Sequence, residues 1–151
     1  STPSDTGVNF YSGICHNGSA FFIISGYGDS LTPRVCSSSD GTSFVELSTL
    51  LTFTNTFVGD PVSLNRIAWN GTYFCATCPN GAYAISTDGV TWDEYEEVGF
   101  AFAQIIGTAT GFLATATDGR TAVITTASAN GTIPALATIT GDNYDFAQSP
   151  I

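Results

Sequence analysis

In the segment AISTDGVTWDE, residues 84–94, an apolar run leads into a Ser-Thr-Asp-Gly turn and a Thr-Trp pair. The chain carries a second version of this skeleton, CSSSDGTSFVE, at residues 36–46. An Asp-Gly pair between two short alternating segments is a strong signal for a β-hairpin. The same hairpin written twice predicts a repeated β unit.

The repeat extends beyond these hairpins. Segments 13–44 and 66–92 each contain an Asn-Gly pair followed by an Asp-Gly pair, and segment 104–133 is a third, fainter version of the unit. In this alignment Phe22 matches Phe74 and Phe112. The sequence therefore predicts an all-β chain that forms a single domain over residues 1–151. Its three antiparallel, four-stranded units should lie at about 8–50, 60–98 and 100–140.

The Asn-Gly pairs predict the first turn of each of the first two units. Asn17-Gly18 and Asn70-Gly71 each follow a short apolar segment and precede another. Asn-Gly is favoured in two-residue type I′ hairpin turns, where both residues have positive φ. We therefore expect type I′ turns at both pairs.

Composition excludes two classes of partner. The 151 residues include 13 carboxylates but only three Lys and Arg together, which gives a net charge of −10. Nucleic-acid binding needs a basic surface, so we expect no nucleic-acid partner. No segment reaches the ~18 apolar residues of a membrane span, so we expect no membrane insertion. The polar start of the sequence has no signal-peptide pattern, which predicts assembly in a cytoplasm.

The two hairpins STDGVTW and SSDGTSF, residues 86–92 and 38–44, resemble shortened Asp-boxes of sialidase-like β-propellers. Their form is similar to the BNR-type repeats of bacteriophage virion proteins and bacterial surface proteins. The resemblance implies propeller-like blades whose hairpins lie away from any catalytic centre. We expect Ser and Asp to bond nearby amides, Gly to take a positive φ, and the aromatic residue to pack over the hairpin. The residues assigned to these structural turns are Ser38, Asp40, Gly41, Ser86, Asp88, Gly89 and Trp92.

No set of residues predicts catalysis. A sialidase needs three clustered arginines, whereas Arg34, Arg66 and Arg120 fall in three different units. His16 is the sole histidine and aligns with Trp69, which indicates a packing role. We therefore predict a protein that is not an enzyme, with no catalytic residues, no cofactor and no metal site.

The four cysteines predict free thiols. Cys75 and Cys78 are three residues apart in a predicted strand, so their side chains should point to opposite faces. Cys15 and Cys36 fall on strands separated by a third strand, too far apart for a disulfide. Free thiols fit assembly in a reducing compartment.

Three blades cannot close a propeller, so the chain should associate with itself as a dimer or trimer. The apolar segment 99–106, GFAFAQII, is either part of that contact or an internal strand. With the resemblance to phage repeats, this predicts a structural protein on the virion surface of a bacteriophage. It would be a capsid decoration or fibre component that binds other virion proteins and is assembled in the host cytoplasm.

The alternative function is carbohydrate binding by a lectin-like or receptor-binding module. In that case Trp69, Tyr73 and Tyr83 would stack on a host surface glycan. The same three residues are also the candidates for contact with a protein partner. A lectin should repeat its binding residues from unit to unit. Trp69 is replaced by His16 in the first unit, which argues against this alternative.

Overall fold

A computed structural model describes residues 11–25, 34–48, 64–96, 99–125 and 136–139 of the chain. Its regular elements are β1 (Tyr11–His16), β2 (Phe21–Ser25), β3 (Val35–Ser38), β4 (Val45–Ser48), β5 (Arg66–Trp69), β6 (Phe74–Thr77), β7 (Ala82–Ser86), β8 (Asp93–Glu96), β9 (Phe102–Thr108), β10 (Gly111–Ala116), β11 (Thr121–Thr125) and β12 (Leu136–Ile139). The described residues contain no helix, and so none that is long and apolar enough to cross a bilayer. The all-β prediction is confirmed.

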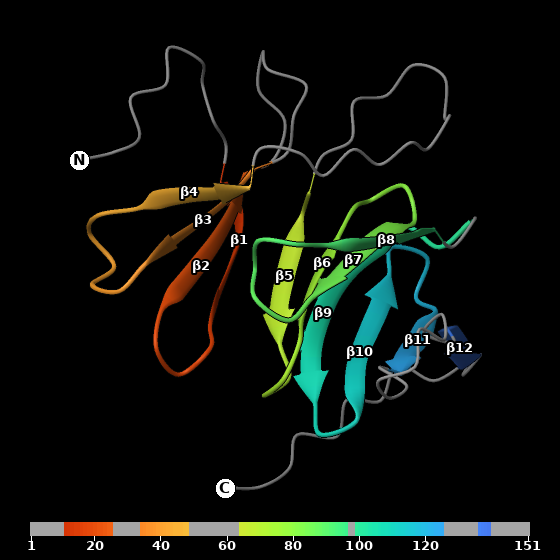
Figure 1. Cartoon of the computed structure of the whole chain (residues 1–151). Coiled ribbons are helices and arrows are strands. Elements are labelled where there is room, and N and C mark those ends of the chain that lie inside the picture. The colour runs from red at the N-terminus through yellow and green to blue at the C-terminus, as the bar shows by residue number, and fades with distance from the viewer. Residues whose placement is uncertain (1–10, 26–33, 49–63, 97–98, 126–135, 140–151) are drawn as a thin grey trace, which may run out of the picture.

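The strands form three antiparallel four-stranded sheets. Sheet A runs β1-β2-β3-β4, sheet B runs β5-β6-β7-β8, and sheet C has β9 to β12 in the same consecutive order. The first strands of the sheets are neighbours, with β5 between β1 and β9, and the later strands fan outward (Figure 1). The predicted third-unit hairpin at 126–135 lies outside the described residues.

The strand register corrects the alignment of the first two units. His16 lies opposite Phe21 in sheet A, as Trp69 lies opposite Phe74 in sheet B. The residue equivalent to Phe74 is therefore Phe21, and the predicted match with Phe22 is wrong by one position. The error matters because a shift of one residue moves every side chain of a strand to the other face of its sheet.

With this register, every sheet has two faces that we name by their residues. The front faces carry Ile14, Phe21 and Cys36 in sheet A, Ile67, Phe74 and Ala84 in sheet B, and Ile105, Phe112 and Ile124 in sheet C. The back faces carry Cys15, Phe22 and Ser37 in sheet A, Ala68, Cys75 and Ile85 in sheet B, and Ile106, Leu113 and Val123 in sheet C.

The hydrophobic core forms where the back of one sheet meets the front of the next. Phe22 on the back of sheet A stacks on Phe74 on the front of sheet B, with ring centroids 4.3 Å apart. Cys75 on the back of sheet B shares a second cluster with Phe112 on the front of sheet C. Each cluster removes large apolar side chains from water, which is the main stabilising contribution in such a fold.

The segment 99–106 belongs to the second cluster. Phe100 and Phe102 are each 1% exposed and their rings make an edge contact at 4.8 Å. The segment was predicted to be either part of a contact between copies or an internal strand. Phe102 lies in β9 and Phe100 just before it, and both side chains are internal. Ile106 differs, because it lies on the back face of sheet C and is 59% exposed.

Two glycines allow the innermost strands to approach closely. A Cβ at Gly13 in β1 would lie 3.0 Å from the amide nitrogen of Ile67 in β5. At Gly107 in β9 a Cβ would overlap the carbonyl oxygen of Trp69. Arg66 joins all three sheets, since its guanidinium donates to the carbonyl of Ser12 at 3.3 Å and to the Gln104 side chain at 3.2 Å.

Replacing Gly107 with alanine should destabilise the chain strongly. The added methyl group meets backbone atoms of Trp69, which cannot rotate away, so β9 must move off β5. We expect a loss of about 2–3 kcal/mol in the free energy of unfolding, measured by urea denaturation. Gly18→Ala is the control, because Gly18 has nothing within 4 Å and only its positive φ opposes the change, at a cost of ~1 kcal/mol. Equal losses in the two variants would contradict the close-approach argument.

Candidate functional site

The Ser-Thr-Asp-Gly turn between β7 and β8 is held by its own side chains. The Ser86 hydroxyl donates to Asp88 Oδ1 at 3.0 Å and accepts the Gly89 amide at 2.8 Å. Asp88 Oδ1 also accepts the amides of Val90 and Thr91, each at 2.8 Å. The Ser86 hydroxyl and Asp88 Oδ1 are therefore bonded within the turn itself.

The turn between β3 and β4 repeats this network. Ser38 donates to Asp40 Oδ1 at 2.9 Å and accepts the Gly41 amide at 2.9 Å. Asp40 Oδ1 accepts the amides of Thr42 at 2.8 Å and Ser43 at 2.9 Å. Both glycines have positive φ, +73° and +76°. The bonding expected for the structural turns is present in both.

These hydrogen bonds act on the charged form of each carboxylate. For Asp40, the amides of Ser43 and then Thr42 hold the pKa well below its usual range. For Asp88, the amides of Thr91 and then Val90 lower the pKa in the same way. A donor to the anionic form favours that form, so both residues stay charged at every ordinary pH.

Aromatic side chains attach the second turn to the core. The Trp92 indole N–H donates to the carbonyl of Gly89 at 3.1 Å, and its ring lies 6.3 Å from that of Phe74. A Cβ at Gly89 would come within 2.7 Å of the Phe22 ring, so this turn of sheet B packs against a side chain of sheet A. The Ser-Thr-Asp-Gly turn therefore closes its own hairpin and also contacts the neighbouring sheet.

The Asn-Gly turns differ from the prediction. Gly18 has φ of +96°, but no residue other than glycine in the described ranges has positive φ, so the turns are not type I′. Instead, Asn17 Oδ1 accepts the amides of Ser19 at 3.0 Å and Ala20 at 2.9 Å. Asn70 does the same for the two corresponding amides. The asparagine side chain thus closes a longer loop, as in an Asx-turn.

The three aromatic residues proposed for sugar stacking do not form one platform. Tyr83 is 2% exposed and stacks on Tyr95 at 5.3 Å, so its assignment as a glycan contact is wrong. Trp69 packs against the cluster between sheets A and B, whereas Tyr73 packs against the cluster between sheets B and C. A sugar ring cannot contact both of these side chains, because sheet B lies between them.

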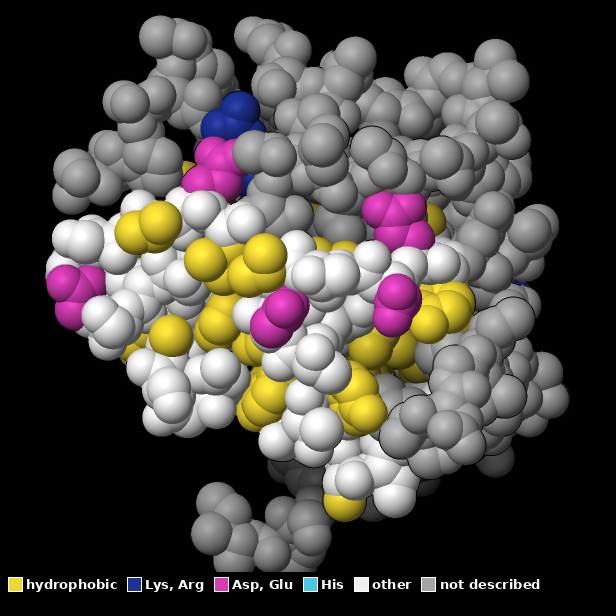
Figure 2. Space-filling view, viewed as in Figure 1, with side chains coloured by type: hydrophobic (Ala, Val, Ile, Leu, Met, Phe, Trp, Pro, Cys, Tyr) yellow, Lys and Arg dark blue, Asp and Glu magenta, His cyan; other side chains and the backbone are white. Residues whose placement is uncertain are grey.

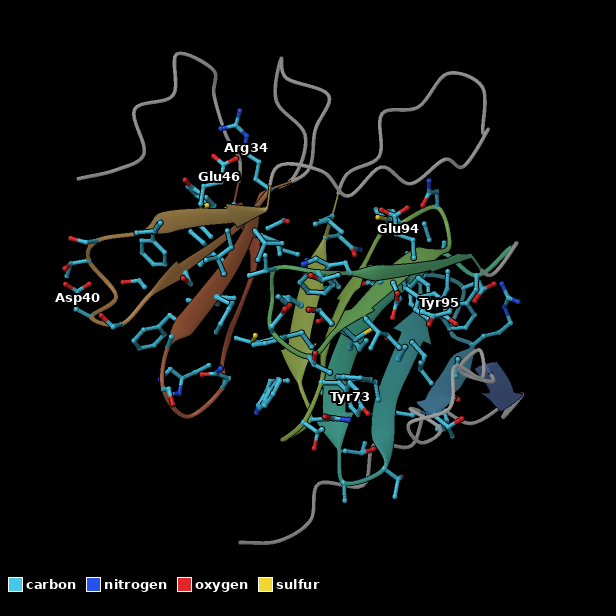
Figure 3. All side chains as sticks on the ribbon, in the orientation of Figure 1. Arg34, Asp40, Glu46, Tyr73, Glu94 and Tyr95 are labelled. Carbon is cyan, nitrogen blue, oxygen red and sulfur yellow. The ribbon has the colours of Figure 1, made fainter. Side chains whose placement is uncertain are left out.

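The ionisable residues are also dispersed. Arg34 and Glu46 pair at 3.2 Å at one end of sheet A, and Asp40 lies at the other end, far from Glu94 and Tyr95 on β8 (Figure 3). Within the described ranges, no group of three or more His, Cys, Asp or Glu could hold a metal.

His16 has a local role, as predicted from its alignment. Its Nδ1 accepts the Gly18 amide at 3.1 Å, and its ring contacts Phe21 at 4.7 Å between centroids. Both contacts lie in one hairpin, so the imidazole packs over its own turn.

Sequence reasoning missed one further turn. Asp118 Oδ1 accepts the Arg120 amide at 3.1 Å, and its other oxygen pairs with the Arg120 guanidinium at 2.7 Å. The guanidinium also lies 5.4 Å from the centre of the Phe100 ring. The Asp118-Gly119 pair was the available signal, but it lies between β10 and β11, one hairpin earlier than in the other units.

All four cysteines are free thiols, as expected. Cys75 belongs to the cluster between sheets B and C, and Cys78 to the cluster between sheets A and B. Cys78 lies just after β6 rather than inside it. Burial raises the pKa of Cys15 to about 12 and that of Cys75 further, so these thiols carry little thiolate at neutral pH.

Comparison with known proteins supports the architecture alone. No family model and no curated protein matches the sequence. The structure is similar to the crystal structure of Saccharomyces cerevisiae Sqt1, with a TM-score of 0.57 and 17% identity. The match covers 89% of this chain but 35% of the yeast chain, so this chain spans about a third of that protein's length. Together with the three sheets, it shows a β-propeller-like all-β fold.

Removing the Asp88 carboxylate should destabilise the β7–β8 hairpin. Asp88→Ala deletes an acceptor for two amides, and we expect a loss of about 1–2 kcal/mol in the free energy of unfolding, measured with urea. Asp88→Asn keeps an oxygen acceptor and should lose less. The control is Asp93→Ala, which removes an exposed carboxylate from the next strand. A similar loss in all three variants would show that negative charge, rather than the turn bonds, matters.

Acid should weaken the fold through the same residue. Because the pKa of Asp88 is lowered by folding, its contribution is complete above the unfolded value of ~3.9 and is lost as the pH falls through the lower folded value. The free energy of unfolding should therefore fall more steeply below about pH 4 in the wild type than in Asp88→Asn. Urea titrations at several pH values measure both slopes, and parallel curves would contradict the assignment.

Proposed function

We propose that this chain is a non-enzymatic structural protein that acts through protein–protein contacts in the virion of a bacteriophage, as a capsid decoration or fibre component. One observation carries the proposal. In each repeated turn the serine hydroxyl and one aspartate oxygen are bonded within the turn, whereas large apolar side chains are exposed on the two outer sheets. Ile14 is 62% exposed on sheet A and Ile106 is 59% exposed on sheet C. Such side chains suit contacts with protein surfaces.

The character of the surface supports the same proposal. Hydrophobic side chains lie in a broken band across the face in view, with carboxylates standing singly among them (Figure 2). A mixed apolar and polar surface of this kind is typical of protein interfaces. The resemblance of residues 38–44 and 86–92 to the repeats of phage virion proteins is the reason for proposing that these contacts are made in a virion.

Carbohydrate binding has less support. Tyr83 is in the core, and Trp69 and Tyr73 lie on opposite sides of sheet B. Of the three aromatic residues named for sugar stacking, Trp69 and Tyr73 are left, and a lectin site needs its binding groups around one ring.

Fractionation of particles tests the virion proposal. An antibody raised against the purified chain would be used on a lysate of the phage that encodes it, separated by buoyant density. We expect the chain to band with the intact particles, and to remain with them after a second gradient. Chain found only in the soluble fraction would overturn the virion proposal. Binding to a glycan array that is lost in Trp69→Ala or Tyr73→Ala, without change in stability, would favour carbohydrate binding instead.

A further inference from the structure

We propose that two copies of this chain bind through the front face of sheet A in one copy and the back face of sheet C in the other. The contact occurs twice, about a two-fold axis, and closes a ring of six sheets. The inference deepens the proposed function, on which it rests, because it identifies one partner of the protein contacts as a second copy.

On the front faces, the exposed fraction of an equivalent isoleucine depends on whether another sheet covers it. Ile14, Ile67 and Ile105 hold the same position on the first strands of sheets A, B and C, by the register of each sheet. Ile67 is 5% exposed and Ile105 is 7% exposed, because the back of the preceding sheet covers each. Ile14 has no preceding sheet among the described residues and is 62% exposed. On the same face of sheet A, Ile23 is 8% exposed and Cys36 is 3% exposed, so the open part of this face lies along β1. An isoleucine kept at this position suits a covered surface.

The back faces give the same result at the other end. Cys15, Ala68 and Ile106 are equivalent by register. Cys15 is half-buried and Ala68 is 6% exposed beneath the following sheet, whereas Ile106 is 59% exposed. Ile106 heads a row of apolar residues across sheet C that continues with Leu113 and Val123, both half-buried.

The exposed parts of these two faces, at Ile14 on β1 and Ile106 on β9, belong to the same pair of surfaces that the chain already joins twice. Each internal junction places a back face on a front face, and the faces left over are one front and one back. They lie on the two end sheets of the array (Figure 1). A second copy offers both faces, so both contacts form together and cover Ile14 and Ile106 of each copy, as expected for closed cyclic symmetry.

The number of sheets favours two copies over three. Closed propellers typically have four to eight blades. Two copies of the three sheets supply six, within this range, whereas three copies supply nine, outside it. This selects the dimer from the two oligomers that the sequence left open.

Mass measurement with matched variants tests the ring. Sedimentation equilibrium of the wild type should give twice the chain mass of 15.7 kDa. Ile14→Asp and Ile106→Asp should each weaken dimerisation more than ~100-fold, because each places an unpaired carboxylate in both contacts. Val45→Asp is the control. Val45 is 65% exposed but lies on the back of sheet A, where the equivalent residue in sheet B is Asp93.

Mixing the two variants separates this ring from other dimers. In a mixed ring, one contact carries both aspartates and the other is entirely wild type. An equimolar mixture of Ile14→Asp and Ile106→Asp should therefore regain dimer that neither variant forms alone. Loss of dimer in Ile14→Asp only, with no effect of Ile106→Asp, would indicate a front-to-front contact and overturn the proposal.

Two further outcomes are decisive. A folded wild-type monomer at high concentration, or a trimer, would overturn the ring. Neither would affect the banding of the chain with particles, so the ring can fail while the virion proposal stands. Because each copy has a net charge of −10, the dimer should bind more tightly in 0.5 M than in 0.05 M salt, and a weaker dimer at high salt would contradict an apolar contact.

Discussion

The first strands of the three sheets, β1, β5 and β9, pack unusually close together, and this packing sets the positions of all the other strands. Gly107 brings β9 so close to the backbone of β5 that a Cβ would overlap it, and Gly13 brings β1 to a distance at which a Cβ would be crowded. This spacing places Phe22 on Phe74 and lets Arg66 reach both neighbouring sheets. Since each sheet has too small a face to be stable alone, the inner contacts set how the later strands fan out and which faces meet.

The turns could be predicted from sequence because their chemistry is local. Ser86 and Asp88 bond amides within three residues, so the four letters of the motif contain nearly all the information required. The strand register, in contrast, depends on residues outside the strand itself. Phe21 and Phe22 are both apolar, so nothing in the alternation shows which one corresponds to Phe74. Pairing across strands decides it, by placing His16 opposite Phe21.

The glycan-contact role predicted for Tyr83 was wrong for a related reason. Sheet B is covered on both faces, and every residue of β7 is buried. A strand buried on both sides loses its alternation of apolar and polar residues, so the sequence could not show that Tyr83 faces the core. The prediction that the chain is not an enzyme stays a prediction. It rests on composition, because a single histidine and three arginines in different units limit the chemistry that the chain can perform.

The placement of two thiols on opposite sides of sheet B has a consequence for how opening of the fold could be observed. Cys75 reports on the junction with sheet C and Cys78 on the junction with sheet A, and both are fully buried. A thiol reagent reaches either residue only when its junction separates. In repeat structures neighbouring units can separate independently. The chain therefore contains a native pair of reporters, and the order in which they are labelled reveals which junction opens first.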